Sequence, residues 1–429
     1  MKITIHRGIE QIGGCITEIE SASGTKILID LGHNLPEGDK LAEDVYDSPK
    51  KLEELLQGVS HIFYSHFHGD HIGFEAKIPS SITQHIGELS LEMLKTLKRH
   101  MTYAKDLKEE ASASLMALNR FQTYQSTKEQ PYGDITVTPY PVSHSAIDAY
   151  MFVIECDGKR VLHTGDFRDH GYRAKDLLAD IETKVGNIDV LITEGTMLDR
   201  TDKRMQSEQE LQDKAFELFN EQSEHSYKYA FVLCSSMDAD RLVSFFQASQ
   251  RANKKRRFLA DRYQIGQLLR IKKGLHAPYN ELFAYNIRKD KQEELKRMKR
   301  YGFTLLVRNS DSFRELIDEI METLQIDPQE VVFIYSQYAG YIDKTRPATF
   351  KHSLYDFVHR YPWHIEHLHT SGHASKEALK SLCEHVQPAT AIIPIHKERK
   401  GSFEQLRLYV KCPILESDQS LENIDIVIQ

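Results

Sequence analysis

The sequence predicts an α/β protein made of two parts that differ in their secondary-structure pattern. Its 429 residues are enough for two or three domains. Residues 1–195 consist mainly of short apolar or alternating runs separated by Gly and Ser, a pattern typical of strands. After residue 200, strand-like and helix-like segments alternate, which predicts a parallel sheet covered by helices. We therefore expect a separate α/β domain to begin near residue 200.

The strands expected in the first part follow one another with one helical interruption. Residues 84–121 are rich in strong helix formers with apolar spacings of three and four, which predicts helix there. Several of the strands end in a polar side chain, and a strand end holds such a side chain rigidly. The expected strands are KITIHRG, CITEIES, TKILIDLG, VSHIFYSH, DITVTPYPVSH, AYMFVIECDG, RVLHTGDF and IDVLITEG.

In the second part, Ser207 and Glu210 have the spacing of a capping box, which predicts that a helix begins there. The tail of the chain returns to polar-ended strands after one further helix. The expected strands are YAFVLC, RRFLA, FTLLV, VVFIYS, TAIIPIHKE and IDIVI, and the expected helices are DADRLVSFFQASQRA, YQIGQLLRIKKG, SFRELIDEIMETLQ and KEALKSLCEHV.

The net charge of −8 argues against indiscriminate binding of nucleic acid through a basic surface. Positive charge is dense only at 251–274 and 288–300, where solvated helix faces or a local basic groove would each explain it. In a groove, Phe258 and Tyr263 would stack on bases, whereas an ordinary strand and an amphipathic helix explain these two residues equally well.

Cysteine usage and the absence of long apolar runs indicate the compartment. Five cysteines are scattered without a C-x-x-C pair, so we expect buried free thiols rather than disulfides. No apolar run reaches the ~18 residues that a membrane span needs, and the amino terminus reads as a strand rather than a signal peptide. We expect a cytoplasmic protein without a membrane partner.

The stretch YSHFHGDHIGF, residues 64–74, places three histidines and one aspartate within six positions: His66, His68, Asp70 and His71. Neutral imidazole is the commonest metal ligand in proteins, and a nearby carboxylate supplies negative charge. A histidine-rich surface turn is the alternative interpretation. The spacing favours a metal site, provided that other parts of the chain supply further ligands.

Four other strand ends carry candidate ligands. Asp30 ends KILI, His144 follows YPVS, Asp166 ends VLHTGD and His396 ends AIIPI. Taken singly, each is better explained as a surface residue, a satisfied core residue or part of a turn. Together with residues 64–74 they predict one metal centre built from several strand ends.

This set resembles the metallo-β-lactamase superfamily, whose second motif is H-x-H-x-D-H. Asp30 matches the first motif of that superfamily, His144 the third and Asp166 the fourth. The segments PVSHSAIDAYMFVIE and VLHTGDFR are similar to the β-CASP subgroup, especially its ribonuclease J branch. The resemblance implies an αββα metallo-β-lactamase sandwich at residues 1–198 and 370–429, with an α/β β-CASP domain inserted at 199–369.

Three further subgroup motifs match by position: Glu194 in ITEGT, His373 in SGHAS and His396 in PIHKE. The turn LCSSMDADRL also resembles the Ser-rich strand-to-helix turn of the inserted domain. Lys397 departs from the pattern, since the family usually has Gly there. The long carboxy-terminal domain of typical ribonuclease J proteins is expected to be missing, which leaves homo-oligomer formation and some RNA contacts open.

The resemblance implies two divalent cations, Zn²⁺ by ligand type with Mn²⁺ as the alternative. Asp30 would orient a ligand imidazole or Asp70 without binding metal itself. A hydroxide shared by the cations would attack phosphorus in line with the leaving oxygen. One cation would be held by His66, His68 and His144, the other by Asp70, His71 and His396, with Asp166 bridging them.

The resemblance also implies substrate-directed roles near the site. His373 would contact phosphate and donate a proton to the leaving oxygen, with Glu194 setting its orientation. The structural alternatives are that His373 caps the following helix and that Glu194 is a buried partner for a strand-end donor. Ser371 and Ser375 flank His373 and are candidates for donating to a terminal phosphate.

These residues predict a metal-dependent phosphodiesterase that acts on single-stranded RNA as an exonuclease, an endonuclease or both. The size of the insertion favours a polymer substrate. His396 favours RNA over DNA, because DNA-processing members of the subgroup generally lack His at this motif. The alternatives are a hydrolase of another phosphodiester or small ester, and a non-catalytic RNA-binding scaffold.

Overall fold

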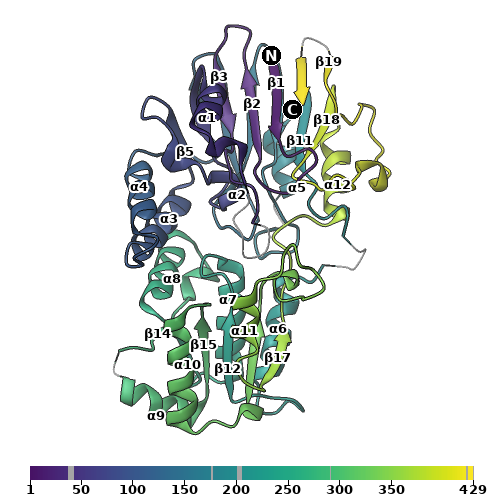
Figure 1. The fold of residues 1–429 in the computed structure, drawn as a ribbon. Coiled ribbons are helices and arrows are strands. Elements are labelled where there is room, and N and C mark those ends of the chain that lie inside the picture. Colours follow the sequence, from purple (N-terminus) through teal and green to yellow (C-terminus); the bar gives the residue numbers. More distant parts are fainter. Residues whose placement is uncertain (37–42, 175–176, 201–204, 290, 422–423, 429) are drawn as a thin grey trace. The chain divides into compact units, whose positions relative to one another are not determined.

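The computed structural model describes residues 1–36, 43–174, 177–200, 205–289, 291–421 and 424–428. The chain divides into two compact units (Figure 1). The first unit comprises residues 1–35, 42–204 and 372–429, and the second comprises residues 36–41 and 205–371. Most of the second unit overlaps residues 199–369, where the insertion is predicted.

The first unit contains two sheets of mixed strand direction. The larger sheet consists, in spatial order, of β19 (Gln419–Leu421), β20 (Ile424–Ile428), β1 (Lys2–Arg7), β2 (Ile16–Glu20), β3 (Lys26–Ile29), β4 (Val59–Phe63), β5 (Thr83–Ile86) and β6 (Gln122–Thr123). The smaller sheet consists of β18 (Ala391–Ile395), β11 (Val190–Glu194), β10 (Lys159–His163), β9 (Ala149–Cys156), β8 (Ile135–Val142) and β7 (Gln130–Tyr132).

The two sheets pack face to face, and strand β9 shows why its sequence is apolar throughout. Successive side chains of a strand point to opposite faces of its sheet. Phe152 and Ile154 join the core between the sheets, together with Phe63 of the larger sheet. Met151 and Val153 face the other way and join a second core against a helix. Both faces of the smaller sheet are therefore covered, which requires a continuous apolar run rather than an alternating one.

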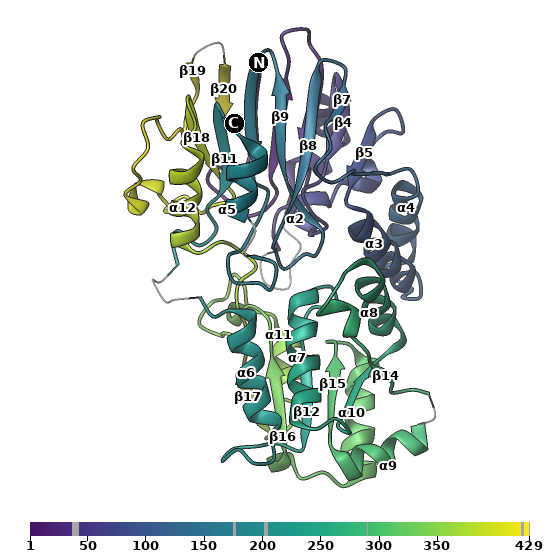
Figure 2. The ribbon, with the colours of Figure 1, turned by 180° about the vertical axis from the view of Figure 1, so that it is seen from behind.

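Helices cover the outer faces of the sandwich (Figure 2). Leu379, Leu382 and Cys383 of the last helix pack on the outer face of the smaller sheet. The predicted αββα sandwich is confirmed. The helices of this unit are α1 (Pro49–Leu56), α2 (Gly69–Ile72), α3 (Glu88–Met101), α4 (Lys108–Leu118), α5 (Leu177–Asp180) and α12 (Lys376–Val386).

The predicted helical segment 84–121 is only partly helical. Gln84 lies in strand β5, where residues 83–85 pair with β4, and α3 begins only after Gly87. Asp148 fixes this start, because its Oδ2 atom accepts a hydrogen bond from the backbone N–H of Ser90 at 3.0 Å. A capping residue some sixty positions away leaves no local signal, so the periodicity placed the start of the helix too early.

Parallel pairing places the polar strand ends together. In the larger sheet β3 and β4 run parallel, and in the smaller sheet β10, β11 and β18 do. The carboxyl ends of parallel strands lie at one edge of a sheet, so Asp30 and Ser65 follow neighbouring strands. Asp166, Glu194 and His396 likewise follow or end three neighbouring strands of the smaller sheet.

The second unit is an α/β layer around one parallel sheet of six strands, which confirms the predicted alternation. Its strands, in spatial order, are β14 (Tyr285–Asn286), β13 (Arg257–Ala260), β15 (Phe303–Val307), β12 (Tyr229–Leu233), β16 (Val331–Tyr335) and β17 (His364–His367). Its helices are α6 (Glu208–Phe219), α7 (Ala239–Ala252), α8 (Arg262–Gly274), α9 (Lys291–Tyr301), α10 (Asp311–Leu324) and α11 (His352–Val358).

Local sequence signals explain several features of this unit. The capping box of Ser207 and Glu210 opens α6 as predicted. Phe258 is 1% exposed within β13 and Tyr263 is 9% exposed at the start of α8. Both residues belong to the packed interior, so the strand-and-helix interpretation of 251–274 holds and these rings do not form a stacking surface.

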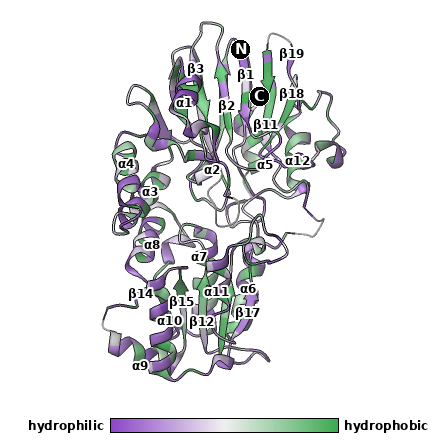
Figure 3. Cartoon of the chain, in the orientation of Figure 1, coloured by the Kyte–Doolittle hydropathy of each residue, from purple (hydrophilic) through white to green (hydrophobic). Residues whose placement is uncertain are grey.

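The strands of both units are coloured mainly as hydrophobic in Figure 3, whereas the helices show both hydrophilic and hydrophobic residues. All five cysteines are free thiols, as predicted, and four of them are buried. None of the helices formed by the described residues is both long enough and apolar enough to cross a membrane.

Candidate metal centre

The loop after β4 and the short helix α2 carry the four residues of the histidine-rich motif. His68 is the residue before α2, and Asp70 and His71 lie within it. The chain following β3 passes directly over this helix: a Cβ atom on Gly32 would lie 1.8 Å from the backbone oxygen of Asp70. Glycine is therefore required at residue 32, because any side chain there would displace α2 and the two ligand candidates on it.

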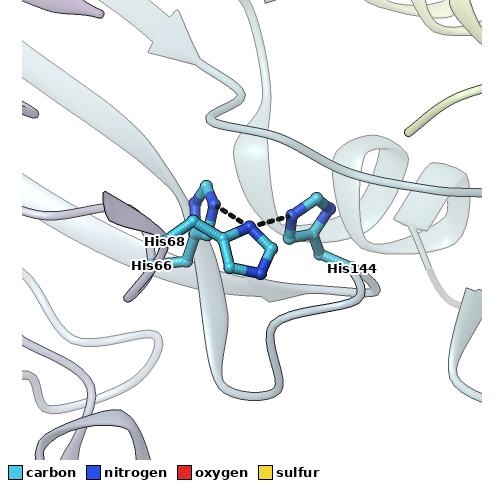
Figure 4. Close-up of side chains that lie close together, drawn as sticks. All are labelled: His66, His68 and His144. Carbon is cyan, nitrogen blue, oxygen red and sulfur yellow. Dashed lines mark hydrogen bonds between the residues drawn. The ribbon is translucent and has the colours of Figure 1, made fainter. Parts of the chain in front are cut away.

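Three imidazoles converge on one point in the first cluster, formed by His66, His68 and His144 (Figure 4). The Nδ1 atom of His68 lies 3.0 Å from Nε2 of His66 and 3.2 Å from Nε2 of His144. In a tetrahedral site with metal–nitrogen bonds of about 2.0–2.1 Å, neighbouring nitrogens are about 3.3 Å apart. The spacing of the cluster therefore fits a metal ion.

Hydrogen bonds to the far side of the rings define which nitrogens have a free lone pair. Nδ1 of His144 lies 2.6 Å from the carbonyl oxygen of Gly372, which only accepts, so Nδ1 carries the proton. Ser65 donates its hydroxyl proton to Asp30 and hence accepts from Nδ1 of His66 at 3.0 Å. The Nε2 atoms of His66 and His144 therefore both direct lone pairs into the cluster, as metal binding requires.

The protonation states in this cluster also suit a metal. Burial lowers the pKa of His68 to about 4. Burial together with the neighbouring imidazoles holds the pKa values of His66 and His144 well below their ordinary range. All three rings are neutral at neutral pH, and the neutral imidazole is the form that binds metal.

A second cluster combines Asp70, His71 and His396. Nε2 of His396 lies 3.2 Å from Oδ2 of Asp70. Nδ1 of His71 lies 2.8 Å from the Asp30 carboxylate and donates its proton there, so that Nε2 is the ring nitrogen that faces this cluster. This buried Nε2 atom has no hydrogen-bond partner among the described residues.

The Nε2 atom of His71 nevertheless lies 3.2 Å from the carboxylate oxygen Oδ2 of Asp166. A lone pair facing a carboxylate at this distance is repulsive unless a positive charge lies nearby. Although burial opposes protonation, Asp166 and Asp30 raise the pKa of His71 well above its ordinary value. The position thus calls for positive charge, and the residues present fit a divalent cation.

Asp166 lies beside both clusters. Its Oδ2 atom is 4.0 Å from Nε2 of His66 in the first cluster and 3.7 Å from Nε2 of His396 in the second. Burial would raise the pKa of this carboxyl, but His396 and His71 lower it well below its usual value. An ionised carboxylate in this position has the geometry that a shared ligand needs; its bridging role stays a prediction.

The Asp30 carboxylate is fully buried and accepts three hydrogen bonds. Ser65 donates its backbone N–H at 2.7 Å and its hydroxyl at 2.8 Å, and His71 donates the third. Of the two partners that the sequence left open for Asp30, the structure places it against the imidazole of His71 and not against Asp70. Asp30 thereby fixes which nitrogen of His71 faces the clusters.

We expect Asp30→Asn to weaken the binding of the cation held by His71 by about 10–100-fold, because the amide nitrogen that replaces one carboxylate oxygen cannot accept the hydrogen bonds made to that oxygen. Competition between the protein and a chromophoric chelator for Zn²⁺ measures this affinity. Asp134→Asn is the matched control, since Asp134 accepts the hydroxyl of Ser23 at 2.7 Å on the surface. Equal affinities in both variants would remove Asp30 from the role assigned to it.

Glu194 and His373 form a third group against Asp166. Nδ1 of His373 lies 3.0 Å from Oε2 of Glu194 and 3.5 Å from Oδ2 of Asp166. The other oxygen of Glu194 accepts the backbone N–H groups of Phe167 and Ala374 at 3.0 and 3.3 Å. Burial alone would lower the pKa of His373, but Glu194 and Asp166 raise it to about 9, so the ring is charged.

The serines beside His373 have different surroundings. Ser375, and not His373, caps helix α12: its hydroxyl accepts from the N–H of Ala378 at 3.0 Å and donates to Asp169 at 2.8 Å. Ser371 is the last residue of the second unit. The predicted contacts of both serines with phosphate stay predictions.

Sequence reasoning missed three groups that orient the ligand candidates. Thr196 donates its hydroxyl to the backbone oxygen of His396 at 3.1 Å and accepts from its Nδ1 at 2.7 Å. The other two are Ser65 and the carbonyl of Gly372, described above. Thr196 lies in ITEGT and Gly372 in SGHAS, so both belong to motifs that the sequence had already singled out. Nothing in the sequence, however, pairs these groups with particular histidines.

A family model described as "Beta-lactamase superfamily domain" matches residues 25–242, just over half of the chain. The chain belongs to the β-lactamase superfamily. A second family model, "Zn-dependent metallo-hydrolase RNA specificity domain", matches residues 362–406 of this chain, a range that includes His373 and His396.

Two curated relatives are similar in sequence to part of this chain. An "RNase J-like protein" of Methanocaldococcus jannaschii is 28% identical over 201 residues, which is 45% of this chain and 42% of the relative. A "Ribonuclease J" of Helicobacter pylori strain 26695 is 26% identical over 184 residues, 40% of this chain and 24% of the relative. The matches thus span less than half of either relative.

A crystal structure of a protein of unknown function from Enterococcus faecalis V583 has the same fold over almost the whole chain. Its TM-score is 0.69 at 19% sequence identity, and the match covers 96% of this chain and 97% of the other. Together with the two family matches, these similarities confirm the predicted resemblance to the ribonuclease J-like, β-CASP branch of the superfamily.

Proposed function

We propose that this superfamily member is a metal-dependent phosphodiesterase that hydrolyses single-stranded RNA. The observation that carries the proposal is the arrangement of two ligand clusters around Oδ2 of Asp166. Nδ1 of His373 lies 3.5 Å from the same oxygen. The match to an RNA-specificity family and the names of the two relatives support RNA as the substrate class.

In this proposal each cluster would hold one divalent cation. The mixed nitrogen and oxygen donors suit Zn²⁺, with Mn²⁺ as the alternative. A bound cation pair supplies an activated water molecule and neutralises charge on the phosphate. His66, His68 and His144 would hold one cation, Asp70, His71 and His396 the other, and Asp166 would contribute to both.

The protein's own groups keep the ligands in one tautomer and orientation. Asp30, Thr196 and the carbonyl of Gly372 each accept an Nδ1 proton, so that the Nε2 atoms of His71, His396 and His144 face the cations. Because Asp30 and Thr196 are buried, we expect these two partners to keep their positions when a cation enters.

His373 is the group that we assign to the substrate. Its charged imidazole would bind a phosphate oxygen and donate a proton to the leaving oxygen as the bond to phosphorus breaks. Glu194 holds the ring in place through Nδ1, and in this proposal Nε2 is the atom that would meet the substrate. No Ser or Cys nucleophile is needed in this scheme.

The test uses the metal-loaded protein and end-labelled single-stranded RNA with a mono- or triphosphate at its 5′ end. We expect degradation, with mononucleotides appearing first if the enzyme is an exonuclease and internal fragments if it is an endonuclease. Turnover of bis(p-nitrophenyl) phosphate without any degradation of RNA would contradict the proposal and favour another phosphodiester. Well under one metal per purified chain would contradict it in favour of a scaffold.

A further inference from the structure

Lys397, the residue directly after His396, is a buried cation. Its side chain is 2% exposed, and its ammonium nitrogen lies 3.1 Å from Oε1 of Glu416, whose side chain is 44% exposed. Glu416 is its only ion-pair partner in the described part of the chain. A buried ammonium is costly without a counter-charge, so this pair is a specific feature of the fold.

Backbone pairing holds Glu416 next to the strand that ends in His396. The N–H of Ile392 in β18 donates to the carbonyl of Pro413 at 3.0 Å, and the N–H of Leu415 donates back to Ile392 at 2.8 Å. Leu415 is buried. The carboxylate of Glu416 is thus fixed relative to β18 by the residue before it and is not carried on a free tail.

The backbone between β18 and Lys397 makes an uncommon turn. His396 has φ = +51°, in the left-handed region that residues other than glycine rarely adopt. Thr196 holds one side of this turn through two hydrogen bonds to His396. Gly195, the residue before Thr196, also packs closely against this turn, since a Cβ atom on Gly195 would lie 3.1 Å from Cβ of Lys397.

We propose that the Lys397–Glu416 ion pair is a positioning device that holds the left-handed turn at His396 and thereby aims its Nε2 atom at Asp70 and Asp166. Lys397 is a positioning residue in this assignment, since its ammonium pairs with Glu416 and not with the ligand groups. The inference rests on the proposed function in one respect, namely that His396 binds a cation.

The two members of the pair should differ in sensitivity. Glu416→Gln removes the counter-charge and leaves a buried ammonium beside a cation-binding residue, whereas Lys397→Met leaves only a half-exposed carboxylate. We expect Glu416→Gln to weaken the binding of one of the two cations by about 10–100-fold. We expect a smaller loss for Lys397→Met, and the double variant should recover to the level of Lys397→Met.

The experiment uses the full-length protein loaded with Co²⁺ or Zn²⁺. Chelator competition gives the number of bound cations and their affinities, and the visible absorption of bound Co²⁺ reports the ligand geometry. Thermal unfolding of the metal-free protein reports the fold alone. Glu10→Gln is the matched control, because Glu10 pairs with Arg399 at 3.4 Å and both side chains are exposed.

The proposal is supported if the affinity for one cation and the Co²⁺ spectrum change in Glu416→Gln but not in Glu10→Gln. It is overturned if only the unfolding temperature falls while affinity and spectrum stay as in the wild type, since the pair would then be structural. If Glu416→Gln does not fold, Lys397→Met decides by the same two measurements. A wild-type protein that binds no cation would contradict the proposed function itself, an outcome distinct from any of these.

Discussion

Asp166→Asn is expected to lower the hydrolysis of single-stranded RNA by about 10³-fold or more and to reduce the number of bound divalent cations. Asp166 is a carboxylate that lies beside both ligand clusters, so neutralising it should weaken both cation sites together. Cations contribute several kcal/mol to stabilising charge in phosphoryl transfer, and each ~1.4 kcal/mol corresponds to a factor of ten in rate.

The measurements are metal content after dialysis and the rate of release of labelled nucleotides. Asp213→Asn is the control, because Asp213 lies on the surface and pairs with Arg251. Circular dichroism should show that both variants are folded. Wild-type activity in Asp166→Asn with two cations still bound would exclude Asp166 from the mechanism, and the bridging assignment would have to be abandoned.

His373→Gln is expected to slow turnover by about 10²–10⁴-fold while the bound cations remain, because general acids contribute rate factors of this size. His373 contacts Asp166 through Nδ1 but belongs to neither of the two ligand clusters assigned to the cations. The loss should appear mainly in kcat if the proton donor acts in the transition state, with KM rising less through the lost phosphate contact.

His385→Gln provides the comparison, since His385 is an exposed imidazole on the helix that follows. Substrates with a better leaving group should lose less rate on His373→Gln, because such a group departs without protonation. A parallel fall in metal content and activity would instead make His373 a ligand, and the acid role would be wrong.

The sequence could predict those parts of the site that lie in one local segment. His66, His68, Asp70 and His71 share one loop and short helix, so their spacing alone indicated a metal site. The more distant candidates, such as His144 and His396, were indicated by their positions at strand ends and by resemblance, because no local spacing connects them to residues 64–74. The alternation of strands and helices after residue 200 was read correctly because burial on both faces of a parallel sheet leaves a strong apolar signal.

What could not be predicted depends on contacts between distant parts of the chain. The carbonyl of Gly372 sets the tautomer of His144 across more than 200 residues, and the choice of His71 as the partner of Asp30 depends on how β3 and β4 pair. Lys397 looked like a departure from a family pattern, and its burial against Glu416 has no local signature. Such pairings follow from packing and not from spacing.

The ligand candidates lie on both sides of residues 205–371 in the chain, which has a consequence during translation. A nascent polypeptide that has emerged as far as residue 371 carries His66, His68 and His144 but not His396. The proposed ribonuclease would therefore emerge from the ribosome with every assigned ligand except His396. It would become competent only when β18 has been synthesised and has paired with β11.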